Sequence, residues 1–245
     1  MKTLILIPSR LSATRLPGKP LLKINGLSII SHVVRKAKEA DIGEVIVAAE
    51  DQEIIDDVEN NGGKAILTSN EHKTGTDRIY EALEKLKLQD IDFVMNLQGD
   101  EPLMNIDDIK NLNNQMIKNK SEFGTLGSII TDKNFHTNKS VVKVKTKQKL
   151  FDTSFPEALD FTRDTDEKAS NIYHHLGIYC YQTQILKKFV SFKQSYKEKE
   201  RSLEQIRALE NGIKINVALA KSSPIGVDTK EDFMALKKIM EYKSE

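Results

Sequence analysis

The sequence predicts an α/β protein with a mostly parallel sheet and a mixed α/β lobe inserted in its second half. In the first half, short apolar runs alternate with segments whose apolar residues recur at helical spacing, which is typical of βαβ units. After about residue 125, strand-like runs follow one another without long helices between them. We expect one domain over residues 1–245, with the lobe at about 125–212 and the last strand and helix rejoining the main sheet.

The first half is expected to contain four strands and four helices. The helices each carry one apolar face, as Ile29, Ile30, Val33, Val34 and Ala37 illustrate. In chain order the expected elements are a strand at 3–7, a helix at 28–40, a strand at 45–49, a helix at 52–60, a strand at 64–68, a helix at 75–88, a strand at 91–98 and a helix at 106–118.

The second half is expected to be less regular, with a polar, irregular stretch at 155–175. Lys143, Lys145, Lys147 and Lys149 alternate with other residues, which predicts a strand whose lysines lie on a solvated face. The remaining expected elements are strands at 125–130, 140–151, 176–182 and 214–220, and helices at 183–192, 202–211 and 230–242.

Composition argues against several classes of protein. The chain has 37 Lys and Arg against 36 Asp and Glu, and a formal charge of +1 does not favour a nucleic-acid binder. No apolar run approaches the roughly 20 residues of a membrane helix, so no membrane association is expected. The single cysteine, Cys180, cannot form an internal disulfide, and no signal-peptide pattern opens the sequence, so we expect a cytoplasmic protein.

The stretch IPSRLSATRLPGKP, residues 7–20, follows the first strand and carries Arg10, Arg15 and Lys19 among prolines and a glycine. These breakers postpone the next helix to about Ser28 and leave an open loop. Ligands of open α/β sheets bind beyond the carboxyl ends of strands, and guanidinium and ammonium groups hold phosphate oxygens. The loop therefore predicts a triphosphate site, with a merely solvated cationic loop as the alternative.

Three better-known motifs do not fit. No two glycines are separated by one residue, so GxGxxG is absent, and Gly18-Lys19 is followed by Pro20 where a P-loop has Ser or Thr. The DxD pattern of metal-dependent glycosyltransferases occurs at 90–92, before a strand, and at 164–166, in a polar loop. A glycosyltransferase of that kind stays only as an alternative.

Two aspartates follow strands and are candidate metal ligands. Asp100 lies in NLQGDEP just past a buried strand, and Asp228 lies in IGVDTKED, where Thr229 and Asp232 are placed to cap a helix. Mg²⁺ prefers oxygen ligands and usually takes one or two carboxylates together with substrate phosphates. If the fold brings them together, the two carboxylates suit a magnesium pair. Turn and capping roles alone remain open for both.

The stretch TGTDRIYEA, residues 74–82, predicts a helix capped by Thr74, with the amides of Gly75 and Thr76 open to a phosphate or a base edge. Arg78 falls in the first turn, which is unfavourable for a cation unless an anion lies nearby. An ordinary capped helix is the alternative.

His174 and His175 are adjacent, so one can reach a ligand while the other packs, and no Cys/His spacing resembles a zinc site.

Taken together and in order, six motifs resemble the cytidylyltransferases that activate 3-deoxy-manno-octulosonate (Kdo), the acidic eight-carbon sugar of bacterial lipopolysaccharide. They lie between residue 5 and about 235, and read IPSRLSATRLPGKPL, TGTDR, QGDEP, HLGIY, LEQIR and GVDTKED. The resemblance implies a glycosyltransferase A-like (Rossmann-like) nucleotidyltransferase fold and a homodimer. It also implies Mg²⁺-dependent transfer of CMP from CTP to the anomeric hydroxyl of Kdo, giving CMP-Kdo and pyrophosphate.

The resemblance also implies roles for individual residues by their position in these motifs. The triphosphate would be held by Arg10, Arg15, Lys19 and Arg78, with Pro8, Ser9 and Gly75 near the cytidine. Magnesium would be held by Asp100 and Asp228, while Gln98, Arg163, His175, Tyr179, Glu204 and Gln205 would face the sugar acid.

The sequence departs from the family mainly at 160–167. Members of the family carry YFSR-x-x-IP there, whereas this chain has DFTRDTDE, which keeps Phe161 and Arg163. CMP activation of 8-amino-Kdo or of a sialic-type acid therefore stays open, although sialate relatives have a more glycine-rich opening loop ending in Lys-Asn. A catalytically silent nucleotide-sensing module is the alternative from another class.

Overall fold

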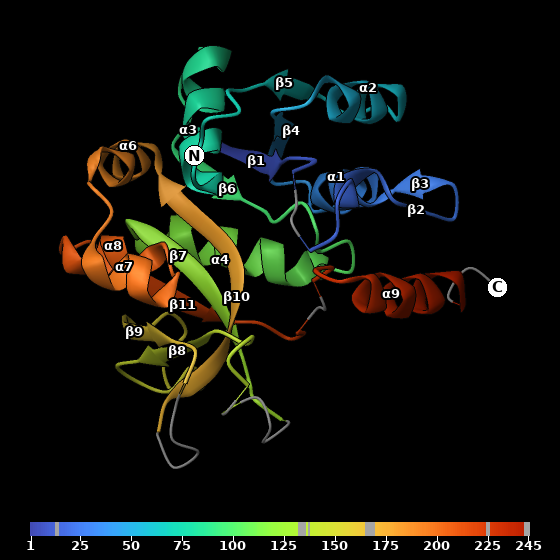
Figure 1. Cartoon of the computed structure of the whole chain (residues 1–245). Coiled ribbons are helices and arrows are strands. Elements are labelled where there is room, and N and C mark those ends of the chain that lie inside the picture. The colour runs from blue at the N-terminus through green and yellow to red at the C-terminus, as the bar shows by residue number, and fades with distance from the viewer. Residues whose placement is uncertain (13–14, 132–135, 137, 165–169, 224–225, 243–245) are drawn as a thin grey trace. The chain divides into compact units, whose positions relative to one another are not determined.

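The computed structural model describes every residue except 13, 14, 132–135, 137, 165–169, 224, 225 and 243–245 (Figure 1). The described chain divides into two compact units. The first unit comprises residues 2–90, 96–106 and 224–245, and the second comprises residue 1 together with 91–95 and 107–223.

The first unit contains the predicted βαβ pattern. Strands β1 (Thr3–Ser9), β4 (Gly43–Ala49) and β5 (Ala65–Leu67) are parallel and lie in the order β1-β4-β5. The side chains from Leu4 to Ile7 are all 0% exposed, so β1 is covered on both faces, which explains its unbroken apolar run. Helices α1 (Ile29–Glu39), α2 (Gln52–Asn60) and α3 (Gly75–Leu86) pack beside these strands.

The long connection from β1 to α1 contains structure that the sequence reading missed. A short 3₁₀ helix, η1 (Lys19–Leu21), is followed by a hairpin of β2 (Lys23–Ile24) and β3 (Leu27–Ser28). Its turn residues Asn25 and Gly26 have φ values of 50° and 78°, the left-handed conformations that a two-residue Asn-Gly turn requires. The predicted start of the next helix is confirmed, because the Ser28 hydroxyl caps α1 by accepting from the Ser31 amide.

The last helix, α9 (Lys230–Tyr242), also belongs to the first unit and lies beside the β2–β3 hairpin (Figure 1). Leu236 of α9 packs with Ile24, Ile29 and Val227 in a small buried cluster. The predicted cap is confirmed: the Asp232 amide donates to the Thr229 hydroxyl, and the Asp232 carboxylate accepts from the Thr229 amide. This cap fixes the backbone next to the candidate metal ligand at position 228.

The second unit contains a mixed sheet with strand order β11-β7-β10-β6. Strand β7 pairs with β11 in parallel and with β10 in antiparallel fashion, and β8 and β9 extend the sheet from β10 in antiparallel pairs. The buried Cys180 lies opposite Gly124 in the β10–β7 pair. The strands are β6 (Phe93–Asn96), β7 (Phe123–Ser128), β8 (Lys143–Thr146), β9 (Ala158–Thr162), β10 (Ile172–Gln182) and β11 (Ile215–Leu219), and the helices α4 (Ile106–Asn119), α6 (Thr183–Ser191), α7 (Tyr196–Arg201) and α8 (Gln205–Glu210).

Two expectations for the second unit are wrong, and one element was missed. The strand expected at 140–151 is only β8, and the described part of 155–175 is not irregular, since it contains β9 and the start of β10. The helix expected at 202–211 is present as α8, while α7 before it is an element that the sequence did not predict; Ser202, between the two helices, has a φ of 52°. These elements are short and stabilised by long-range pairing, so local periodicity identifies them poorly.

The alternating lysines also behave differently from the expectation. Lys145, Lys147 and Lys149 are exposed, but Lys143 is 0% exposed. Its ammonium group donates to the backbone carbonyls of Asn138 at 2.8 Å and Arg163 at 2.7 Å. Each carbonyl satisfies one of the N–H donors of the ammonium group, which offsets part of the cost of burying the cation.

Candidate active site

A pocket of about 310 Å³ opens in the first unit, where four segments of the chain meet. It contains all the residues predicted for the nucleotide and the metal, together with one residue predicted for the sugar. These are Pro8, Ser9, Arg10, Arg15, Lys19, Gly75, Arg78, Asp100 and Asp228, and then Gln98. Leu16, Pro20, His72, Lys73, Thr74 and Gly99 complete the lining.

The two candidate metal ligands meet at a single cation. The Lys19 ammonium lies 2.5 Å from Asp100 Oδ2 and 3.4 Å from Asp228 Oδ1. Asp228 also pairs with Arg15, whose NH2 lies 2.9 Å from Oδ2. The fold therefore brings both carboxylates to one point. This is the condition under which they suit a shared metal site.

The turn around Asp100 is shaped by close packing. A Cβ added at Gly99 would lie 3.0 Å from the Pro8 carbonyl oxygen, so glycine is favoured here by this close approach rather than by a special backbone conformation. Next to Asp100, burial raises the pKa of Glu101 to about 8, helped by the negative charges of Asp100 and Asp228 and opposed by Lys19. Glu101 is therefore mostly protonated at neutral pH and adds little negative charge to the pocket.

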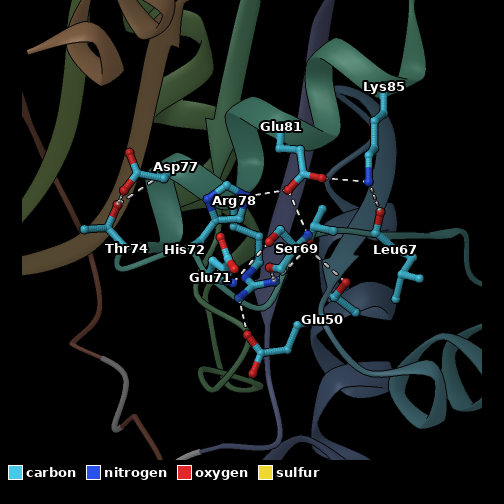
Figure 2. Close-up of polar contacts among 12 residues, drawn as sticks. Glu50, Leu67, Ser69, Glu71, His72, Thr74, Asp77, Arg78, Glu81 and Lys85 are labelled. Carbon is cyan, nitrogen blue, oxygen red and sulfur yellow. Dashed lines mark hydrogen bonds and ion pairs between the residues drawn. The ribbon is translucent and has the colours of Figure 1, made fainter.

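Arg78 is placed differently from the simplest expectation for a triphosphate ligand. Its side chain is 3% exposed, and its guanidinium forms an ion pair with Glu50 (Figure 2). NH1 donates to the Thr68 hydroxyl at 2.7 Å and to the Ser69 carbonyl at 3.0 Å. A cation in the first turn of a helix needs a nearby anion, and for Arg78 that anion is Glu50 of the protein itself.

Glu50 and Asp51 are functional candidates that the sequence reading missed. They directly follow β4, and they hold the opening loop: Glu50 Oε1 accepts from the Ser12 hydroxyl at 2.9 Å, and Asp51 Oδ2 accepts from the Leu11 amide at 2.8 Å. The rule that singled out Asp100, a carboxylate just past a strand, would have found both.

A second polar group supports the pocket wall before α3, and it too was missed. His72 Nε2 is bonded to the Glu81 carboxylate, which also accepts from the Ser69 amide at 2.9 Å and from Lys85 at 2.6 Å (Figure 2). Burial acts to raise the pKa of Glu81, but the hydrogen bonds from Lys85, Ser69 and His72 lower it to about 2. Glu81 is therefore a carboxylate at neutral pH. The predicted cap of α3 is confirmed, since Thr74 accepts from the Asp77 amide.

Most residues predicted for the sugar lie in the second unit. His175 is 6% exposed, and its ring packs edge-on against Phe161 and beside Tyr179. Burial lowers the pKa of His175 to about 3, so the ring is neutral, and Nε2 is bonded to the Thr125 hydroxyl at 3.0 Å. The Tyr179 hydroxyl donates to Gln205 Oε1 at 3.3 Å. The structure therefore brings together His175, Tyr179 and Gln205.

Arg163 and Glu204 have other contacts. Arg163 donates from Nε to the Arg201 carbonyl at 3.3 Å and from NH1 to the Lys139 carbonyl at 3.1 Å. Glu204 lies just before α8, 3.8 Å from Arg207. Part of the predicted 160–167 loop, and Asp166 of the second DxD pattern, lie outside the described residues.

Two negative observations apply to the described residues. No three of their His, Cys, Asp or Glu side chains are grouped so as to hold a metal ion. No helix among them is both long and apolar enough to cross a membrane.

Comparison with known proteins identifies the family. The model of the cytidylyltransferase family matches residues 4–215. A 3-deoxy-manno-octulosonate cytidylyltransferase of Sinorhizobium medicae is 42% identical over 241 residues, covering 98% of this chain and 96% of that protein. The same enzyme of Afipia carboxidovorans is 43% identical over 240 residues, covering 97% and 96%.

Solved structures agree with these matches. The structure of CMP:2-keto-3-deoxy-manno-octonic acid synthetase complexed with CTP has a TM-score of 0.89 at 33% identity, covering 99% of this chain and 100% of that one. Apo UDP-glucose pyrophosphorylase, at 12% identity and a TM-score of 0.75 with full coverage of both chains, shares the nucleotidyltransferase fold alone. The chain therefore belongs to the cytidylyltransferase family and, within it, to the 3-deoxy-manno-octulosonate cytidylyltransferases.

Proposed function

We propose that this chain transfers CMP from CTP to the anomeric hydroxyl of Kdo, giving CMP-Kdo and pyrophosphate for lipopolysaccharide biosynthesis. The observation that carries the proposal is the pocket of the first unit, where Arg15 and Lys19 meet Asp100 and Asp228. Cations for a triphosphate and carboxylates for a metal are the two groups that nucleotidyl transfer requires. The family of the chain supplies the substrates: its relatives are named for Kdo and cytidylyl transfer.

The nucleotide is held, in this proposal, by the loop after β1 and by the start of α3. Arg10, Arg15 and Lys19 bind the triphosphate, and Pro8, Ser9 and Gly75 lie near the cytidine. The Ser9 hydroxyl supports this, because it is buried and has no hydrogen-bond partner among the described residues. A buried hydroxyl without a partner is costly, and a polar ligand in the pocket would relieve that cost.

Arg78 has a supporting role in the same proposal. Its side chain is held by Glu50, Thr68 and Ser69, so in this proposal it stabilises the wall of the nucleotide site that it also lines. Its charge still contributes to the attraction of a polyanion, although Glu50 neutralises much of it.

Magnesium would be held by Asp100 and Asp228. Their fit is supported by the geometry around Lys19, since an ammonium ion already lies within 2.5 Å and 3.4 Å of one oxygen from each. Two carboxylates suit Mg²⁺, which takes its remaining ligands from phosphate oxygens and water. When bound, the metal would neutralise phosphate charge and acidify the attacking hydroxyl.

The chemistry is a single displacement at the α-phosphorus. A bond forms between the anomeric oxygen of the sugar and the α-phosphorus, the bond from that phosphorus to the bridging oxygen breaks, and pyrophosphate leaves. The hydroxyl proton goes to solvent. The cationic loop offsets the charge that accumulates on the leaving pyrophosphate, so this step depends on positioning and electrostatics rather than on a covalent intermediate.

The sugar site, the oligomeric state and the location are further parts of the proposal. In this proposal the sugar acid is faced by Gln98, Arg163, His175, Tyr179, Glu204 and Gln205, with Arg163 on its carboxylate.

The half-exposed Leu159 on β9, at 52%, and Phe151, at 63%, offer apolar surface for a homodimer. A cytoplasmic location is part of the same proposal.

The test is pyrophosphate release by the purified protein with CTP and Mg²⁺, comparing Kdo, 8-amino-Kdo and a sialic acid, with a magnesium-free control. We expect release with Kdo and none without magnesium. Release only with another sugar would overturn the choice of acceptor while keeping the transfer chemistry. CTP binding without release from any sugar would favour the nucleotide-sensing module.

A further inference from the structure

We propose that His72 is a nucleotide-contacting residue that recognises the nucleoside end of CTP, and that Glu81 is the positioning residue that orients its ring. The proposal rests on the proposed function, since it assumes that the pocket binds CTP. None of the sequence motifs singled out His72, and it enters only through its place in the pocket wall next to Thr74 and Gly75.

The first step concerns which ring nitrogen is available. Because Glu81 is a carboxylate that can only accept, the bond between Glu81 and His72 requires the proton on Nε2. Nδ1 has no hydrogen-bond partner among the described residues, and the side chain is 22% exposed on the pocket wall. Nδ1 is therefore the ring atom left for a ligand.

The second step concerns rigidity. Glu81 belongs to α3, and it is fixed from two further sides by the Ser69 amide and by Lys85. Lys85 also donates to the Leu67 carbonyl at 3.0 Å, and the buried Arg78 holds the Ser69 carbonyl (Figure 2). The ring is thus attached to a frame that joins the end of β5 to α3. Such a frame is what a binding group needs in order to keep its geometry, and it is more than a solvated histidine requires.

The third step concerns which part of the nucleotide is recognised. Within the pocket, the carboxylates and cations of the metal region involve Lys19, Asp100 and Asp228, whereas His72 adjoins Thr74 and Gly75 at the start of α3. A Cβ at Gly75 would lie 3.2 Å from Pro8 Cγ, so this end of the pocket is narrow and partly apolar, which suits a base or a ribose better than a triphosphate.

Two substitutions at His72 separate ligand contact from structural support. In His72→Gln the side-chain amide can still donate to Glu81 from a place close to Nε2, but the pocket-side nitrogen is lost. In His72→Asn the amide lies close to Nδ1, and the bond to Glu81 is lost. Lys36→Met is the matched control, because it removes an ammonium group that pairs with Glu39 on α1 and that belongs neither to the pocket lining nor to the frame around Glu81.

The experiment is calorimetric binding of CTP, CMP and inorganic tripolyphosphate to each variant, with thermal unfolding as the check on folding. We expect His72→Gln to weaken CTP and CMP by the same factor, about tenfold, and to leave tripolyphosphate unchanged. His72→Asn should retain more CMP affinity than His72→Gln does, and Lys36→Met should stay within about twofold of the parent for all three ligands.

Each contrary outcome overturns the proposal. CTP and CMP affinities of a folded His72→Gln variant within twofold of the parent would exclude a contact. If His72→Gln weakened tripolyphosphate binding more than CMP binding, His72 would contact the phosphates instead of the nucleoside. If it lowered the affinity for all three ligands equally, its role would be structural. The parent is assayed alongside for pyrophosphate release with Kdo: a parent that binds CMP but releases no pyrophosphate fails the proposed function alone, whereas one that does not bind CMP fails both.

Discussion

Two groups of ion pairs in the first unit differ in how fully the protein encloses them. The Arg78 and Glu50 side chains are 3% and 8% exposed, and Arg78 is also bonded to Thr68 and Ser69. In the pocket, Lys19 and Asp100 are 13% and 27% exposed, and Arg15 and Asp228 are 65% and 48% exposed. The enclosed pair is almost completely shielded from solvent, so it is part of the framework. The open pairs can exchange partners with a ligand, so they are part of the site.

The comparison is tested most strongly at the proposed metal ligand. Asp100→Ala should lower kcat by about a thousandfold or more, because the stabilisation that a metal gives to phosphoryl displacement amounts to several kcal/mol. Pyrophosphate release measures the loss, and thermal unfolding should change little. Asp107→Ala, which removes a carboxylate 64% exposed, is the control and should remain active. Near-normal turnover by Asp100→Ala would contradict the assignment of Asp100 as a magnesium ligand.

The enclosed pair should respond in stability instead. Glu50→Ala leaves a buried guanidinium without its counter-charge, which costs about 3–5 kcal/mol and corresponds to a fall in Tm on the order of 10 °C. Glu44→Ala removes an exposed pair with Lys64 and should cost less than about 1 kcal/mol. Chemical and thermal unfolding compare the two variants. Equal losses from both would mean that enclosure does not distinguish the pairs.

Glu81 gives a test by pH. Its pKa is about 2 in the folded protein against 4.5 ordinarily, so its contribution is present above about pH 4.5 and is lost as the pH falls towards 2. This contribution is at most about 3 kcal/mol. The free energy of unfolding of the parent should therefore fall more steeply between pH 5 and 3 than that of Glu81→Gln. Parallel curves for the two proteins would contradict a carboxylate held by Ser69, His72 and Lys85.

The smallest expected effect concerns the open cluster. In the absence of nucleotide, Lys19→Met should bind Mn²⁺, a probe for the proposed magnesium site, about tenfold more tightly, because the ammonium no longer competes for Asp100 and Asp228. Electron paramagnetic resonance of free Mn²⁺ measures this without turnover. Arg10→Met is the control, since Arg10 lines the same pocket and is not among the cations paired with these aspartates in the described chain. Equal gains in Mn²⁺ affinity for both variants would mean that the loss of any positive charge in the pocket, and not competition by Lys19 for the aspartates, causes the effect.

The sequence predicted the first unit well because strands β1 and β4 are largely buried and its helices are amphipathic, so that each leaves a clear local pattern. The opening loop, Asp100 and Asp228 were also predictable, because each follows a strand and parallel strands present their carboxyl ends at one edge. The second unit was harder. Strands β8 and β9 are short, and their pairing partners are distant in sequence, so the pattern of local residues carries little information about them.

What the sequence could not give was the partner of each charge. Lys143 reads as one of four similar lysines, and only the carbonyls of Asn138 and Arg163 explain its burial. Arg78 was expected near an anion, but whether that anion is a substrate or Glu50 depends on contacts 28 residues apart in sequence. Ion-pair partners are selected by the tertiary structure, so residue types alone leave them open.

The position of Cys180 has a practical consequence. It is the single thiol of the chain, it is 0% exposed on β10, and burial raises its pKa. Thiol reagents attack the thiolate, so labelling of the native protein must wait until β10 separates from β7. The rate of thiol modification therefore reports how often this sheet opens, and it can be measured on the native sequence without an engineered cysteine.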